Sequence, residues 1–164
     1  MTDKRHENRE NVFKLLFAKD FSPEISPENF YDDYAANSEE KISGKVRSAF
    51  IAVCENRDDI DCEIEGTSLK WKLSRMSTVT RNVLRLAVYE LGVGEIPAKV
   101  IINEAIELVK TYDDDGAAGF VNGILNKIAR EHSLIANGGE SSVTEADQGS
   151  VDADVAEKEA VTEE

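Results

Sequence analysis

Hydrophobic residues recur every three or four positions along most of the chain, the spacing that places them on one face of a helix. Residues 3–20 carry such a stripe, formed by Val12, Phe13, Leu16 and Phe17. Residues 79–91 are apolar around most of their circumference, which is typical of a helix in the middle of a bundle. No segment shows a sustained alternation of apolar and polar residues. The pattern therefore predicts an all-α fold with about six or seven helices.

Prolines and small polar residues indicate where helices begin. Pro27 suits the first turn of a short helix. A longer helix is expected over residues 38–64, because Ser38 is followed by two glutamates, as at a capped start. The charged run RDD at 57–59 is expected to leave the middle of this helix exposed or bent. Thr67 is expected to cap a short helix. Within that helix, Trp71 is expected to be a core anchor rather than a platform for base stacking.

The second half of the chain predicts two more helices after the apolar one. Gly92 and Gly94 are expected to end the apolar helix, and Pro97 to start the next. The run DDDG at 113–116 predicts a turn whose acids favour the N-terminus of the last helix.

The composition changes after residue 136. Residues 137–164 contain no aromatic residue, nine acids and one lysine, a net charge of −8. Such a segment cannot bury enough apolar area to offset its ordering entropy. We expect a helical domain over residues 1–136, made of two small packed bundles at about 1–66 and 67–136, followed by a disordered acidic tail.

Charge is unevenly distributed. The chain has a formal net charge of −14, yet residues 4–19 hold five bases against two acids. Local fields matter more than the sum for binding, so a basic start remains a candidate for binding phosphate. No run approaches the roughly 20 apolar residues of a membrane helix, and the N-terminus lacks the apolar core of a signal peptide. These features favour a cytoplasmic protein without a membrane segment.

The residues that usually carry catalysis are poorly placed. His6 and His132 lie near opposite ends of the helical body, outside any nucleophile or metal motif. Cys54 and Cys62 form no metal or redox motif and are expected to be small buried hydrophobes. The sequence thus predicts no enzyme, no metal and no cofactor.

Arginines within apolar segments favour a structural role. Arg75, Arg81 and Arg85 are such residues, and buried arginines need carboxylate partners. Glutamates on helices expected to pack nearby could supply them: Glu90, Glu104 and Glu107.

Several longer runs, in order, resemble the NusB family of transcription antitermination factors. They are WKLSR at 71–75, VTRNVLRLAVYEL at 79–91, IPAKVIINEAIELVK at 96–110 and FVNGILNKI at 120–128. The pair RE at 9–10, followed by LLF at 15–17, resembles the first helix of the family. The resemblance covers about residues 4–132.

This resemblance implies an all-α fold of two helical bundles and no catalytic activity. It implies binding to the boxA element of nascent ribosomal RNA transcripts, as a heterodimer with the ribosomal protein NusE. With other Nus factors, such proteins keep RNA polymerase from terminating early. A protein-only helical interaction module with weakened RNA contacts is the alternative, and the formation of a homodimer stays open.

The resemblance also suggests RNA-binding residues. The family's basic N-terminal arm falls on Lys4, Arg5 and Arg9, and its Phe-Val-Asn-Gly motif falls on Phe120 and Asn122. Phe120 either stacks a base or belongs to the core. Asn122 either contacts RNA or serves helix packing.

Overall fold

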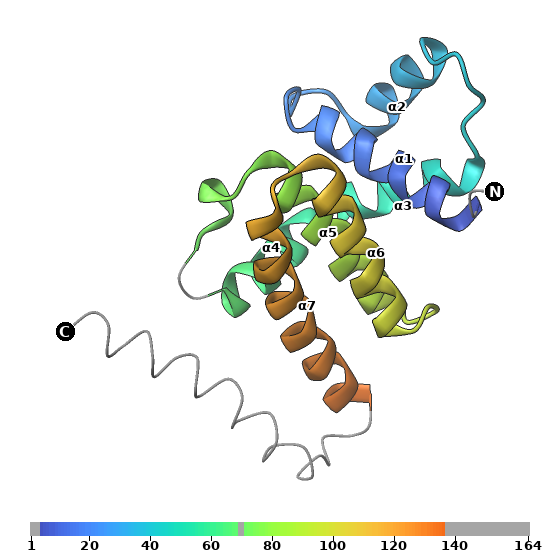
Figure 1. Cartoon of the computed structure of the whole chain (residues 1–164). Helices are drawn as coiled ribbons and strands as arrows, with labels where there is room; N and C mark the ends of the chain where they lie inside the picture. The colour runs from blue at the N-terminus through green and yellow to red at the C-terminus, as the bar shows by residue number, and fades with distance from the viewer. Residues whose placement is uncertain (1–3, 69–70, 137–164) are drawn as a thin grey trace. The chain divides into compact units, whose positions relative to one another are not determined.

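The computed structural model describes residues 4–68 and 71–136 (Figure 1). The predicted tail at 137–164 lies outside the described residues. Contacts divide the chain into a unit of Met1–Ala129 and a second unit of Arg130–Glu164, and the features below belong to the first. The predicted division at about residue 66 stays a prediction.

Within the described residues the structure is helical and contains no strand, which confirms the all-α prediction. The elements are α1 (Lys4–Lys19), α2 (Pro27–Ala36), α3 (Gly44–Glu55), α4 (Arg57–Thr67), the 3₁₀ turn η1 (Leu73–Arg75), α5 (Thr78–Val93), α6 (Ala98–Tyr112) and α7 (Asp115–Ala136).

Serine side chains cap the N-termini of three helices, α2, α3 and α5. The hydroxyl of Ser26 accepts a hydrogen bond from the Asn29 amide at the start of α2, and Ser77 does the same for Thr80 in α5. Such caps satisfy amides that have no partner within the helix. At its other end α5 stops at Gly94, whose φ of 76° lies in the left-handed region that favours glycine.

The long helix expected over 38–64 is wrong in its start, and its middle, expected to be exposed or bent, is a break between two helices. Ser38 does not cap a helix, because its hydroxyl is used in a local turn with the backbone of Glu40. Ser43 caps α3 instead, accepting from the Lys45 amide. Asn56 then separates α3 from α4, and its side-chain amide donates to the Ala52 carbonyl at the end of α3.

The short helix expected after Thr67 is also wrong. Thr67 is the last residue of α4 rather than a cap. Between α4 and α5, the described residues form the single turn η1, where the Glu65 carboxylate accepts a hydrogen bond from the Leu73 amide.

Helix α5 is the centre of the first unit, as its apolar circumference predicts. It packs against α1, α3, α4 and α6, and Figure 1 shows it among these helices. Its buried residues include Val83, Leu84 and Val88. Large side chains from other helices complete the core around them: Leu15, Phe50, Ile64, Ile101 and Leu125. Burying one such side chain stabilises the fold by about 1.5–3 kcal/mol.

Candidate nucleic-acid interface

The start of α1 is tied to α5 and α6 through Arg9. The Arg9 guanidinium donates from Nε and Nη2 to the Glu90 carboxylate at 2.9–3.1 Å, and its Nη1 lies 3.4 Å from Glu104. Arg9 is only 8% exposed. Arg9 is therefore buried in ion pairs, unlike an exposed cation of a basic arm, and its RNA contact stays a prediction.

His6 extends this cluster toward the surface. Its Nδ1 is hydrogen-bonded to the Glu104 carboxylate. This hydrogen bond and the negative charge of Glu104 outweigh partial burial and raise the pKa of His6. We call Arg9, Glu90, Glu104 and His6 the Arg9 cluster.

Lys4 and Arg5 are exposed on the first turn of α1. Lys4 Nζ lies 3.5 Å from Glu7, and both side chains are largely in solvent, where such pairs contribute little. Arg5 and Arg9 line one groove of about 540 Å³, together with Lys45 of α3 and Tyr89 of α5. The structure thus brings two of the predicted cations to one groove.

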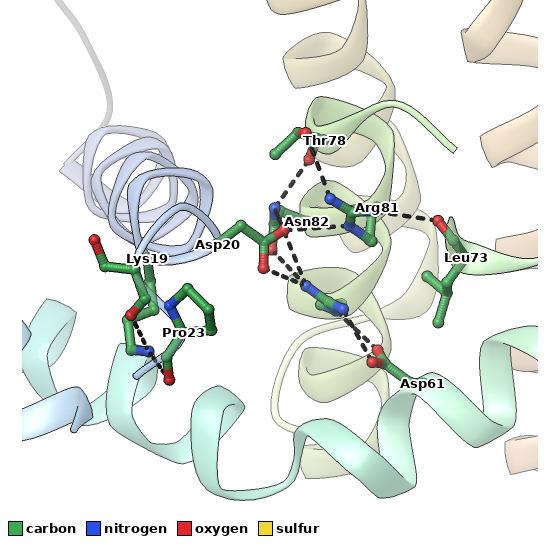
Figure 2. Close-up of polar contacts among 10 residues, drawn as sticks. Lys19, Asp20, Pro23, Asp61, Leu73, Thr78, Arg81 and Asn82 are labelled. Atoms are coloured by element: carbon green, nitrogen blue, oxygen red, sulfur yellow. Dashed lines mark hydrogen bonds and ion pairs between the residues drawn. The ribbon is translucent and has the colours of Figure 1, made fainter. Parts of the chain in front are cut away.

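A second arginine cluster joins the end of α1 to α4 and α5. Arg85 donates to Asp61 at 2.8 and 2.9 Å and to Asp20 at 3.1 and 3.3 Å. Figure 2 shows Asp20 facing Asn82 and Arg81 as well, and both donate to its Oδ2. We call these five residues the Arg85 cluster.

This cluster confirms the structural interpretation of Arg81 and Arg85 but changes their partners. Their carboxylates are Asp20 and Asp61, whereas two of the glutamates expected to serve them are partners of Arg9. Burial would raise the pKa of Asp20, but the Asn82 hydrogen bond and the two guanidinium charges hold that pKa below its usual value.

Phe120 lines a separate groove of about 470 Å³ at the start of α7. Its side chain is half-buried and packs against the core. Phe120 therefore fits both alternatives, a core residue and a ring that could stack on a base. Trp71 and Arg75 line the same groove. Trp71 is 48% exposed, and the expectation that it anchors the core is wrong.

Polar groups from α5 and the turn before α7 also line the Phe120 groove. Asp113 accepts hydrogen bonds from the hydroxyls of Ser77 and Thr80. Burial would raise the pKa of Asp113, but these hydrogen bonds lower it. Arg75, unlike the other two arginines, is exposed, and its side chain makes no ion pair with any residue that the structure describes. The groove therefore combines aromatic rings, hydroxyls, a carboxylate and a guanidinium.

Asn122 is exposed on α7 and does not line the Phe120 groove. Its side-chain oxygen accepts a hydrogen bond from Asn126, one turn later. The packing alternative for Asn122 has no support from this exposed position.

Two residues of these grooves, Trp71 and Lys45, were not among the predicted site residues. A signal for Trp71 exists, because lysines flank it on both sides at 70 and 72, and basic residues interleaved with an aromatic are typical of nucleic-acid surfaces. Lys45 carries no local signal and joins Arg5 only through the packing of α3 on α1.

The sequence matches a known protein family. The family model described as "NusB family" matches residues 6–130. The chain belongs to the NusB family. It is 34% identical over 130 residues to the transcription antitermination protein NusB of Bdellovibrio bacteriovorus, an alignment covering 78% of this chain and 96% of the relative. It is 40% identical to that of Lachnoclostridium phytofermentans, over 76% of this chain and 97% of the relative.

Solved NusB structures share the fold. The structure of T. maritima NusB is 39% identical and superposes with a TM-score of 0.69, covering 80% of this chain and 94% of that one. A structure of the antitermination factors NusB and NusE in complex with dsRNA contains a chain that is 26% identical. It superposes with a TM-score of 0.70 and covers 80% of this chain and 99% of that one.

The cysteines of this NusB-family chain differ in exposure. Cys62 is exposed, contrary to expectation, whereas Cys54 is partly buried and burial raises the pKa of its thiol to about 11. Among the described residues, no group of His, Cys, Asp and Glu is arranged to hold a metal ion. None of the helices in that part of the chain is long and apolar enough to cross a membrane.

Proposed function

We propose that this protein is a transcription antitermination factor that binds boxA-type RNA of nascent ribosomal transcripts together with NusE. It acts in the cytoplasm by binding rather than by catalysis, and with other Nus factors it helps RNA polymerase avoid premature termination. The observation that carries the proposal is the likeness, over 80% of the chain, to NusB in a complex with NusE and dsRNA.

Charge explains why the partner is needed. The chain is acidic overall, with a formal net charge of −14, and RNA affinity depends on cations that replace the counterions of the phosphates. The described basic residues at the start of α1 are few. A basic ribosomal partner would complete the positive surface, so RNA and NusE should bind cooperatively.

The two grooves suggest a division of roles. Lys4 and Arg5 contact backbone phosphates, and Arg9 holds their helix turn against Glu90. Phe120 and Trp71 offer aromatic faces in one groove, where an unstacked base could lie. Asn122, exposed on the same helix as Phe120, contacts RNA through its amide.

The test is fluorescence anisotropy with labelled boxA-like RNA and a scrambled RNA, each with and without NusE. We expect weak binding by the isolated protein and markedly tighter, sequence-dependent binding when NusE is present. The protein-only interaction module would be favoured instead if adding this protein to NusE left the RNA affinity unchanged and equal for the two RNAs.

The base-stacking role is tested at Trp71. Stacking of one base on an aromatic ring contributes about 1–3 kcal/mol, so Trp71→Ala should weaken RNA binding by about 5- to 150-fold. Trp71→Phe keeps an aromatic face and should retain most of the affinity. Equal affinities of the alanine and wild-type proteins would remove Trp71 from the RNA surface.

A further inference from the structure

The groove beside the Arg9 cluster is built from three regions that are distant in sequence. Arg5 and Asn8 of α1 line it together with Lys45 and Ala49 of α3. The third region runs from α5 through the loop to the start of α6 and includes Tyr89 and Pro97. Because α1 packs directly on α3 and α5, this groove is part of the folded unit rather than a loop feature.

Ion pairing inside the groove leaves it with a positive balance. Glu90 lines it, but its carboxylate is occupied by the two hydrogen bonds from Arg9 Nε and the one from Nη2. The other charged residues of the lining are Arg5, Lys45 and Glu95. The groove therefore holds one more positive than negative charge, in a chain whose formal net charge is −14.

Lys45 occupies a position where a cation is not favoured by the helix itself. It lies in the first turn of α3, which contains no acidic residue. The helix dipole makes a cation at this end unfavourable. Lys45 is exposed, and its ammonium forms no ion pair with any residue among 4–68 and 71–136. Neither capping nor a salt bridge accounts for a lysine here.

The rest of the lining suits a sugar–phosphate chain. Tyr89 is half-buried, and the exposed Val100 and Pro97 add apolar surface at the rim. Cations beside apolar and aromatic surface are what proteins present to a single strand. A peptide partner would need a basic segment to match Glu95, whereas two exposed cations match an anionic chain.

We propose that this groove binds the RNA backbone and that Lys45 of α3 is a phosphate-contacting residue beside Arg5 of α1. The inference rests on the proposed function and extends its RNA surface from the basic first helix to α3. Glu95, on the rim of the groove, opposes the bound phosphates.

The experiment measures the affinity of the complex of this protein with NusE for boxA-like RNA, at salt concentrations from about 0.05 to about 0.3 M. Losing one phosphate contact to a single strand lowers the slope of log affinity against log salt by about 0.7. For Lys45→Gln we therefore expect that smaller slope and about fivefold weaker binding near 0.1 M salt. Glu95→Gln should bind RNA more tightly than the wild type.

Arg47→Gln is the matched control. Arg47 lies on the same helix and carries the same charge, but its guanidinium stands 5.6 Å from the centre of the Tyr31 ring and does not line the groove. Its loss should leave the salt slope unchanged. Circular dichroism confirms that each variant is folded.

The outcomes separate the two levels of the proposal. If the wild type binds RNA and Lys45→Gln keeps the wild-type slope, the groove assignment is overturned and the proposed function stands. If Lys45→Gln and Arg47→Gln lower the slope equally, the effect is one of net charge and the assignment also falls. If the wild-type complex does not bind boxA-like RNA at all, both fall together.

Discussion

Arginine–carboxylate pairs join the two ends of α1 to α5. In one pair the cation comes from the α1 side, and in the other it comes from α5. At the start of α1 the cation, Arg9, belongs to α1 and the anion, Glu90, to the end of α5. After the end of α1 the anion, Asp20, belongs to the α1 side, and the cations belong to the first half of α5. This reciprocal pairing selects the antiparallel register of the two helices.

The two clusters differ in their surroundings. This difference corresponds to a structural role for the Arg85 cluster and to a place beside the candidate RNA surface for the Arg9 cluster. In the Arg85 cluster the charged groups face one another and Asn82, at the junction of α1, α4 and α5. In the Arg9 cluster, by contrast, Arg9 and Glu90 line an open groove, and Glu104 is hydrogen-bonded to a histidine. The same ion-pair chemistry therefore secures the fold at one end and positions a basic surface at the other.

The largest expected effect comes from breaking the Arg85 cluster. Arg85→Gln leaves Asp20 and Asp61 without their shared cation, and removing one partner of a buried ion pair costs about 3–5 kcal/mol. The free energy of unfolding, measured in urea, should fall by about that amount. Arg81→Gln should cost much less, because Asp20 keeps Arg85 and Asn82. Equal losses in the two variants would contradict this hierarchy.

Arg9→Gln is expected to have the second largest effect and to lower the free energy of unfolding in urea by about 2 kcal/mol. When the cation is lost, Glu104 keeps its hydrogen bond to His6, so Glu90 is the carboxylate left without its partner. Arg9→Lys should recover only part of the loss, because lysine cannot form the bidentate contact.

RNA binding by the same Arg9→Gln variant distinguishes contact from positioning. If Arg9 acts by holding the first turn of α1, affinity falls while the salt slope stays that of the wild type. A slope lowered by about 0.7 would instead show that Arg9 contacts a phosphate directly. Unchanged affinity and slope would remove Arg9 from RNA binding altogether.

Local patterns predict the helices well and the site only in part. The apolar spacing in α1 and α5 is a property of neighbouring residues, so it can be read directly from the sequence. Ser38 and Ser43 show the limit of this reading, because both offer a hydroxyl before a possible helix and only the competing turn at Glu40 decides between them.

Charge partners depend on how helices far apart in sequence cross one another. Glu90 and Glu104 could be recognised as partners for an arginine, but their pairing with Arg9 requires α1 to lie against α5 and α6. Trp71 illustrates the same limit, because whether a tryptophan is buried depends on the segment that covers it. The Arg5–Lys45 groove likewise exists only once α3 has packed on α1.

Asp20 makes the stability of the Arg85 cluster depend on acid pH. Its pKa in the folded protein lies below the ordinary value of 3.8, so its stabilising contribution is complete above pH 3.8 and is lost as the pH falls through the folded value. Urea unfolding of the wild type should therefore lose more stability between pH 5 and pH 2.5 than unfolding of Asp20→Asn. Parallel pH profiles for the two proteins would contradict a depressed pKa at Asp20.

The smallest effect belongs to His6 and lies on the opposite side of the pH scale. Glu104 raises the pKa of His6 above 6.5 in the folded protein. The contribution of protonated His6 is therefore complete below pH 6.5 and is lost as the pH rises through the folded value. Because both side chains are partly exposed, their ion pair contributes no more than about 1 kcal/mol. Urea unfolding at low salt should show wild type more stable than His6→Asn at pH 5.5, with the difference shrinking toward pH 8.5. In the Glu104→Gln background the same substitution should show no such pH dependence. A wild-type advantage that stays constant across this range would mean that His6 packs against α6 without carrying a charge.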